Sequence, residues 1–141
     1  MKTVILCIAL ASFLIFSSCS DDSPTNSSST TYKYTGYSEN GSIIISAYLW
    51  VDSVDSSIIT GGWDLIRVGN EENLGPQIGK GNFEGIKDSQ GCMSLNLNPE
   101  WVDNNVFLIG SLLNSSYSGD WNYVGYPGVI NSGTFEAKQL H

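Results

Sequence analysis

Few side chains in this sequence are of the types that carry acid–base, nucleophilic or metal chemistry. The only histidine is His141, and a side chain at the very end of a chain is a poor general base because terminal residues are rarely held in place. Ser-His-Asp and Cys-His mechanisms therefore lack their base, and no cluster of cysteine and histidine offers a zinc site. Gly79-Lys80-Gly81 lacks the spacing of a phosphate-binding loop. The sequence predicts no catalytic residue, no metal ligand and no cofactor.

Paired carboxylates are the remaining candidates for hydrolytic chemistry. The pairs are Asp52 with Asp55, Glu71 with Glu72, and Glu100 with Asp103. Glycoside hydrolysis needs two carboxyl groups about 5–10 Å apart across a sugar, and acids in loops more often only face solvent. No EF-hand spacing for calcium is present. We therefore predict a protein that is not an enzyme, and we keep a hydrolase that uses loop carboxylates as an alternative.

The N-terminal segment has the composition of an export signal. Lys2 supplies a positive charge, and the apolar run Val4–Phe16 follows it. This run is too short to span a bilayer, which needs about 20 residues, but its length suits the core of a signal peptide. We therefore expect residues 1–18 to be a signal helix that is removed.

Cys19 directly follows this segment, and its neighbours suggest a chemical role. The residues Phe16-Ser17-Ser18-Cys19 resemble the lipobox of bacterial lipoproteins, although the family usually has leucine where this chain has Phe16. The resemblance implies that the Cys19 thiol carries a diacylglycerol group and that the membrane is a partner through this lipid. An ordinary secretory signal cut after Ser20 is one alternative, and an uncleaved N-terminal anchor, disfavoured by the short apolar run, is another.

The residues after Cys19 are polar. Ser20-Asp21-Asp22 resembles the acidic surface-export tag of lipoproteins from Bacteroidota-type bacteria, which implies an outer-membrane or cell-surface location. Residues 19–31 have the composition of a flexible tether, and residues 32–141 remain for one folded domain. With Cys19 carrying lipid, Cys92 is left alone, so no intrachain disulfide can form.

The charge balance excludes one class of partner. The chain has 6 Lys+Arg and 14 Asp+Glu; removal of Lys2 with the signal leaves five basic side chains against the 14 acidic ones, a formal charge of −9. No basic stripe is present, so binding to the phosphate backbone of a nucleic acid is not expected.

The folded domain has the period-two pattern of half-buried antiparallel strands rather than a helical pattern. Asn40-Gly41 is a strong hairpin turn, and only 98–105 suggests a short helical turn. We predict an all-β, up-and-down meander of about eight strands. The predicted strands are 32–37, 43–51, 57–68, 80–85, 92–97, 106–112, 117–123 and 133–138.

A Gly-x-aromatic pattern recurs in this domain. Its members are Gly61-Gly62-Trp63, Gly81-Asn82-Phe83, Gly119-Asp120-Trp121 and Gly133-Thr134-Phe135. Glycine permits sharp curvature of a strand and the ring fills the interior, so the pattern favours a closed barrel over a β-sandwich. Residues 118–123 and 132–137 resemble strands of the calycin group of lipocalin- and avidin-like barrels, which implies a small barrel that can hold a ligand.

Three functions follow from these patterns. The first is a lipid-anchored cell-envelope protein that binds a small apolar or sugar-like ligand inside its barrel. The side chains expected to line that cavity are Trp63, Phe83, Trp121 and Phe135. The second is a structural or protein-interaction module of the envelope with a filled barrel, for which the outward-facing Tyr48 and Trp50 offer a contact surface. The third is the hydrolase that uses loop carboxylates. The sequence does not indicate an oligomeric state.

We expect Cys19→Ala to abolish metabolic labelling with fatty acid and to release the protein from the membrane, because the substitution removes the sulfur that would bear the lipid. Labelling with palmitate and membrane fractionation measure both effects. Cys92→Ala is the matched control and should remain labelled. A labelled Cys19→Ala protein would contradict the lipobox interpretation.

Overall fold

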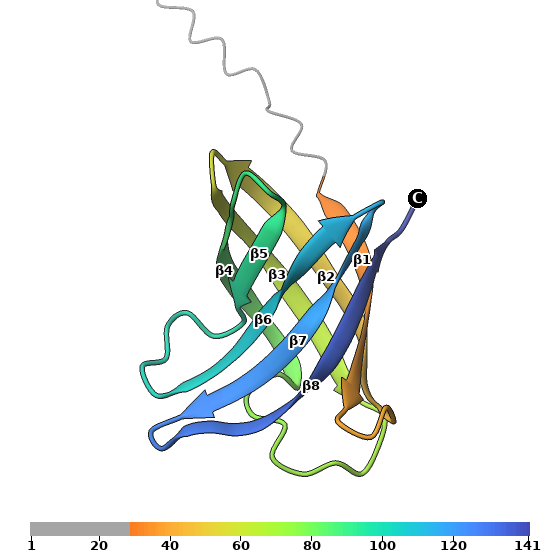
Figure 1. Cartoon of the computed structure of the whole chain (residues 1–141), viewed down its shortest axis with the longest axis vertical. Helices are drawn as coiled ribbons and strands as arrows, with labels where there is room; N and C mark the ends of the chain where they lie inside the picture. Colours follow the sequence, from red (N-terminus) through yellow and green to blue (C-terminus); the bar gives the residue numbers. More distant parts are fainter. Residues whose placement is uncertain (1–28) are drawn as a thin grey trace, which may run out of the picture.

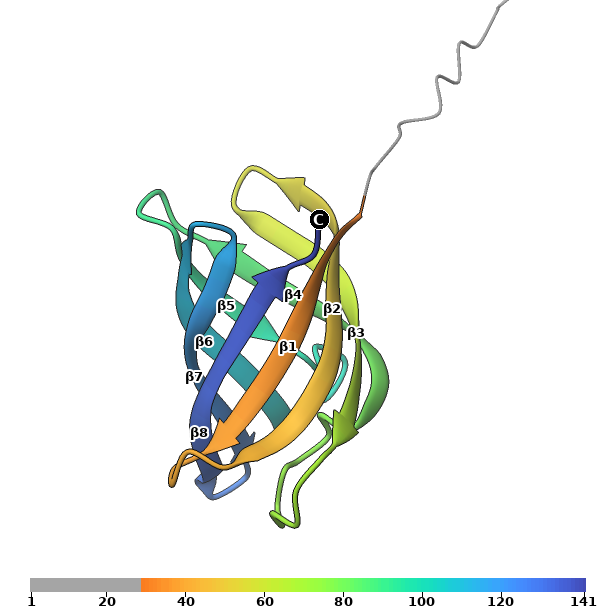
Figure 2. The same cartoon turned by 90° about the vertical axis from the view of Figure 1, so that its right-hand side faces the viewer.

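The computed structural model describes residues 29–141, which form a closed barrel of eight antiparallel strands. Each strand pairs with its neighbours in chain order, and the last strand pairs with the first (Figures 1 and 2). The strands are β1 Thr30–Ser38, β2 Ile43–Asp55, β3 Ile58–Arg67, β4 Gly79–Lys87, β5 Cys92–Asn96, β6 Asn104–Leu113, β7 Ser116–Gly125 and β8 Gly128–Gln139. The predicted all-β meander of eight strands is confirmed, and it closes into a barrel rather than a sandwich.

The predicted signal helix and Cys19 lie outside the described residues. Within 29–141, no helix is long and apolar enough to cross a membrane. The predicted helical turn at 98–105 is wrong: residues 98–103 are a loop without helix, closed by a hydrogen bond from the Trp101 N–H to the Asn98 carbonyl at 3.1 Å, and residues 104 and 105 begin β6.

The two ends of the barrel differ. The first described residues and the C-terminus lie at one end, called here the tether end, together with tight turns after β2, β4 and β6 (Figure 1). The opposite end, called the loop end, carries the connections 39–42, 68–78, 97–103 and 126–127. All the long connections therefore lie on the side away from the start of β1.

Side chains fill the interior of the barrel. Its largest fully buried members include Trp121, Tyr34 and Phe83, which come from different strands. An apolar hollow among Tyr32, Leu112 and their neighbours measures about 20 Å³, which is room for about one water molecule. A sugar or fatty acid does not fit the interior unless core side chains move.

Glycine and aromatic residues face each other across the β3–β4 pair. Gly61 lies opposite Phe83, and Trp63 lies opposite Gly81. A Cβ atom on either glycine would lie 2.6 Å from the ring that faces it. The two Gly-x-aromatic segments therefore pack reciprocally, because each ring occupies the space that the opposite glycine leaves empty.

The β7–β8 pair repeats this register but only half of this packing: a Cβ atom on Gly133 would lie 2.7 Å from the Trp121 indole, whereas one on Gly119 would meet the main chain of Ile109 and Gly110. Gly119 lies opposite Phe135, and Trp121 lies opposite Gly133. Each tryptophan also donates from its indole Nε1 to a main-chain carbonyl beyond its own strand pair: Trp63 to Leu97 and Trp121 to Tyr37, both at 2.8 Å. The barrel thus consists of two similar halves, β1–β4 and β5–β8, which meet at two junctions, β4–β5 and β8–β1.

The loop 68–78 closes the loop end. Leu74 and Gln77 are buried, and the Gln77 amide donates to the Leu74 carbonyl at 2.7 Å. The ring of Tyr123 lies against Gly75, where a Cβ atom would be 2.5 Å away. This loop acts as a plug, so the barrel has no open mouth at this end.

The buried face predicted for the strand 43–51 is wrong at its first residue. The sequence pattern places Ile43 with the buried side chains of β2, but Ile43 is exposed and Ile44 is buried. The register explains the difference: Gly36 pairs with Ile45 and Tyr37 pairs with Ile43, so Ile44 is the extra residue of a β-bulge. A bulge reverses the alternation of side chains on either side of it.

Two tyrosines pack on Phe135 in the interior but differ in their hydrogen bonds. The ring centroids of Tyr34 and Tyr117 lie 5.8 Å and 4.7 Å from that of Phe135. The Tyr117 hydroxyl donates to the Leu108 carbonyl at 2.6 Å, whereas the Tyr34 hydroxyl has no partner among residues 29–141. Burial raises the pKa of both phenols, and Tyr117 raises the pKa of Tyr34 further.

We expect Tyr117→Phe to lower the free energy of unfolding by about 1 kcal/mol, because it removes a buried hydrogen bond to the Leu108 carbonyl. Tyr34→Phe should leave stability at pH 7 unchanged or raise it. The unfolded chain ionises its tyrosines near pH 10 and the folded chain only at higher pH, so stability is complete below pH 10 and falls above it. Either substitution should reduce this alkaline loss. Urea unfolding at pH 7 and pH 10.5 tests all three expectations, and equal losses at pH 7 would contradict the hydrogen-bond assignment.

Candidate functional site

The barrel wall is incomplete at the junction between β4 and β5. β5 pairs with β4 only along Glu84–Lys87. The preceding residues of β4, Gly79–Phe83, pair with β3 on one side, and in the described part of the chain no strand pairs with their other side. After β5 the loop 97–103 stands away from the wall (Figure 1). We call the space between Gly79–Phe83 and this loop the β4–β5 cleft.

The cleft consists of two adjoining hollows on the outside of the barrel. The larger has a volume of about 380 Å³ and the smaller about 320 Å³, and both are lined by Asn82, Pro99 and Glu100. Ligand-binding pockets in proteins usually measure about 300–1,000 Å³. The cleft is therefore large enough for a ligand, in contrast to the interior.

Asn98 turns the chain out of the sheet and so forms the cleft. Its main-chain N–H donates to the side-chain oxygen of Asn96 at 3.0 Å instead of to a strand, and the next residue is Pro99, which has no N–H to donate. The Asn98 side chain donates to the Pro76 carbonyl at 2.8 Å and accepts from the Val106 N–H at 3.3 Å. These bonds fix the loop against the plug and keep the cleft open.

The exposed edge of β4 presents its main chain to the cleft. In an antiparallel strand, successive residues direct their N–H and C=O groups to alternate sides. The Lys87 N–H donates toward β3, to the Ser57 carbonyl, and the Asp88 N–H donates in the opposite direction, to the Cys92 carbonyl. Every second residue before Asp88 therefore faces the same side as Asp88. Lys80 and Asn82 are two of these residues, so their N–H and C=O groups point into the cleft.

The side chains around this edge are of mixed character. Trp63 forms part of the floor, held by its bond to the Leu97 carbonyl. Trp101, which is 55% exposed, stands on the loop side. Lys80, Asn82 and Glu100 are exposed at the rim, and the Lys80 ammonium lies 2.9 Å from the Asp64 carboxylate. The cleft thus offers flat apolar surface together with donors and acceptors.

The structure places the four predicted lining residues in the interior, where none is more than 3% exposed. They form two separate groups, Trp63 with Phe83 and Trp121 with Phe135. Trp63 lines the larger hollow of the cleft and Phe83 the smaller one, and the other two have no part in it.

Sequence reasoning missed the residues that define the cleft. Trp101, Asn82 and Asn98 were not singled out, although an aromatic residue just after the break at Asn98-Pro99 was an available signal. The cleft also depends on how far β5 pairs with β4, which the alternation of side chains does not reveal.

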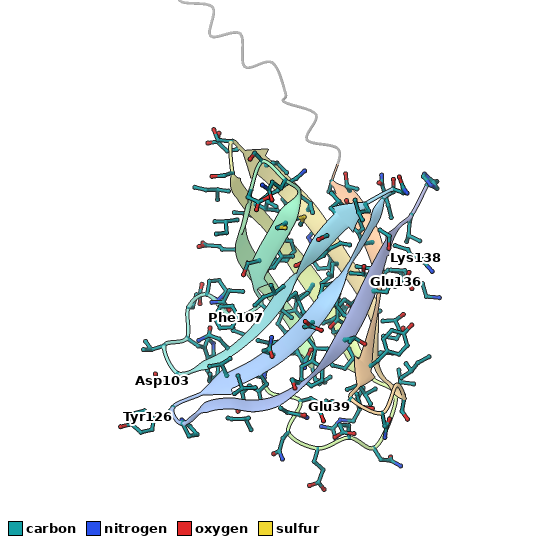
Figure 3. All side chains as sticks on the ribbon, viewed as in Figure 1. Glu39, Asp103, Phe107, Tyr126, Glu136 and Lys138 are labelled. Carbon is teal, nitrogen blue, oxygen red and sulfur yellow. The ribbon has the colours of Figure 1, made fainter. Side chains whose placement is uncertain are left out.

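The other candidate residues are dispersed. Glu100 lines both hollows of the cleft and Glu84 the smaller, whereas Asp52 and Asp55 are exposed on β2. Glu71 and Glu72 line a different surface hollow, beside Asn40, and Asp103 projects at the loop end (Figure 3). Within residues 29–141, no group of three or more His, Cys, Asp or Glu side chains is placed to hold a metal ion.

The outward-facing aromatics and the free cysteine lie on the barrel wall. Tyr48 is 48% exposed between Lys33 and Asp64 on the neighbouring strands. Trp50 is half-buried, because its ring lies over Gly62. Cys92 is exposed at the start of β5.

Comparison with known proteins gives no relative: no family model, no curated protein and no solved structure matches this chain. The functional argument therefore depends on the geometry described above.

We expect Trp63→Phe to loosen the loop 97–103, because the indole bond to Leu97 holds the loop across the incomplete junction. Hydrogen exchange of the amides of this loop should become faster. Trp121→Phe is the matched control: it removes the equivalent bond to Tyr37, but seven residue pairs between β1 and β8 close that junction. If hydrogen exchange accelerated equally around Leu97 in Trp63→Phe and around Tyr37 in Trp121→Phe, this role of Trp63 would be contradicted.

Proposed function

We propose that this protein is a lipid-anchored, non-enzymatic binding protein of the cell envelope, and that its ligand occupies the β4–β5 cleft. The lipobox-like sequence at Cys19 and the polar tether support the anchor and an outer-membrane or cell-surface location. The resemblance of residues 118–123 and 132–137 to calycin strands supports a binding role. The incomplete junction supports a ligand on the wall rather than in the interior.

One observation carries the location of the binding site. The hollow inside the barrel measures about 20 Å³, whereas the larger hollow of the cleft measures about 380 Å³. Entry of a ligand into the interior would displace side chains such as Phe83 and Tyr117, which are buried in the core. A ligand in the cleft displaces only solvent.

The lining favours an elongated ligand with both polar and apolar parts. The two hollows adjoin at Asn82 and follow β4 from Lys80 toward Glu84. Trp101 supplies a flat apolar surface, and aromatic side chains with a polar edge contribute strongly to recognition. The amide of Asn82 and the carboxylate of Glu100 supply a donor and acceptors.

Trp101→Ala tests the proposal. The folded protein is screened against a panel of oligosaccharides and against a library of short peptides, and the affinity of any ligand found is measured by calorimetry. Loss of an aromatic anchor usually costs about 2 kcal/mol or more, so binding should weaken about 30-fold. The control is Tyr126→Ala, because Tyr126 is 91% exposed at the β7–β8 turn and lines neither hollow (Figure 3). A ligand whose affinity Trp101→Ala does not change would contradict the location, and absence of any ligand would contradict the function.

A further inference from the structure

We propose that the β4–β5 cleft binds an extended peptide, which adds to the barrel as a strand along the edge of β4. This inference rests on the proposed binding function and names the class of ligand. It is carried by two observations: the main-chain groups that β4 presents to the cleft, and the strand that fills the equivalent position at the other junction.

The first observation is the edge itself. Lys80 and Asn82 each direct one N–H donor and one C=O acceptor into the cleft, and within 29–141 no strand pairs with them there. An extended peptide satisfies such groups with its own main chain, as in other cases of strand addition to a sheet edge. A sugar hydroxyl also binds single groups, but only a strand matches their repeat along β4.

The second observation is the β8–β1 junction. Gly81 and Glu84 of β4 correspond to Gly133 and Glu136 of β8, because the equivalent pairs Trp63–Gly81 and Trp121–Gly133 align them. Glu84 pairs with Asn96, and Glu136 pairs with Thr35. Up to this point the two junctions are alike.

Beyond this point the junctions differ. β1 continues through Gly36, Tyr37 and Ser38, which pair with Phe135, Thr134 and Gly133. β5 ends at Asn96, and the corresponding part of β4 stays uncovered. The cleft is therefore the position of an absent strand segment, and Gly36–Ser38 shows what kind of segment completes such a junction.

The same comparison indicates the side chains of the peptide. A strand beside β4 alternates between one side chain that faces the barrel and one that faces outward. Trp63 occupies the space behind Gly81, so the inward side chain must be small, as it is at Gly36 and Ser38 in β1. The outward side chains lie beside Asn82 and Glu84. The structure thus favours an extended peptide with glycine, alanine or serine at its inward positions.

A peptide from the chain itself provides the probe. The segment Gly36–Asn40, made as an acetylated and amidated peptide, is added at millimolar concentration to the isotope-labelled protein. We expect the amide resonances of Lys80 and Asn82 to shift and their hydrogen exchange to slow, because these N–H groups gain acceptors. The same peptide with tryptophan in place of its glycine should cause neither change.

Two variants at Asn82 separate main-chain from side-chain recognition. Asn82→Pro removes the N–H that faces the cleft and leaves the pairing with β3 intact, since proline is tolerated at sheet edges where its nitrogen faces solvent. Asn82→Ala keeps the N–H and removes the side-chain amide. We expect the peptide to bind the proline variant about tenfold more weakly than the alanine variant, because only the proline variant lacks the main-chain N–H.

A peptide with N-methylated inward-facing amides provides the second test if the proline variant does not fold, and it should bind weakly to the original protein. Equal binding to both Asn82 variants, or undiminished binding of the N-methylated peptide, would overturn the strand proposal. If an oligosaccharide binds in a manner that requires Trp101 and the peptides do not, the strand proposal is overturned and the proposed function stands. If neither perturbs the residues of the cleft, both proposals fail.

Discussion

The packing of aromatic rings on glycines determines most of this structure. An eight-stranded barrel has an interior just wide enough for side chains to fill, and here rings from β3, β4, β7 and β8 occupy it. Three of these rings, those of Trp63, Phe83 and Trp121, each occupy the space over a glycine on the paired strand. The glycines also allow the strands to curve enough for closure. One constraint therefore sets both the curvature and the absence of a large interior cavity.

A filled interior moves the question of function to the outside of the barrel. The two halves bury similar rings, but only one junction is closed by a full ladder of strand pairs. At the other, Asn98 and Pro99 end the pairing early, and Trp63 bridges the remaining distance through a single hydrogen bond to Leu97. The feature that distinguishes the halves is thus a local loss of pairing, and it coincides with the cleft.

Much of the fold was predictable because it follows from local alternation. Leu95 and Trp121 are buried as their period-two patterns require, and the Gly-x-aromatic segments indicated closure correctly. Ile43 was assigned to the wrong face because a bulge depends on pairing with β1, which no single segment records. The cleft was missed for a similar reason: how far two strands remain paired is a property of both, whereas Trp101 alone resembles any loop aromatic. The assignment of Cys19 rests on sequence motifs alone, because that residue lies outside the described structure.

The distribution of the connections gives the barrel a polarity. β1 begins at the tether end, and the plug loop lies at the loop end (Figure 2). The loop 97–103, which carries Trp101 at the rim of the cleft, belongs to the loop end as well. A barrel held from its entry side would point that rim away from its support, with roughly the length of β2 between them. Thirteen residues of extended chain correspond to about 40 Å at most. In such a molecule the barrel would act as a spacer. The cleft would lie at the end farthest from the supporting membrane, where a partner could bind it without contacting that membrane.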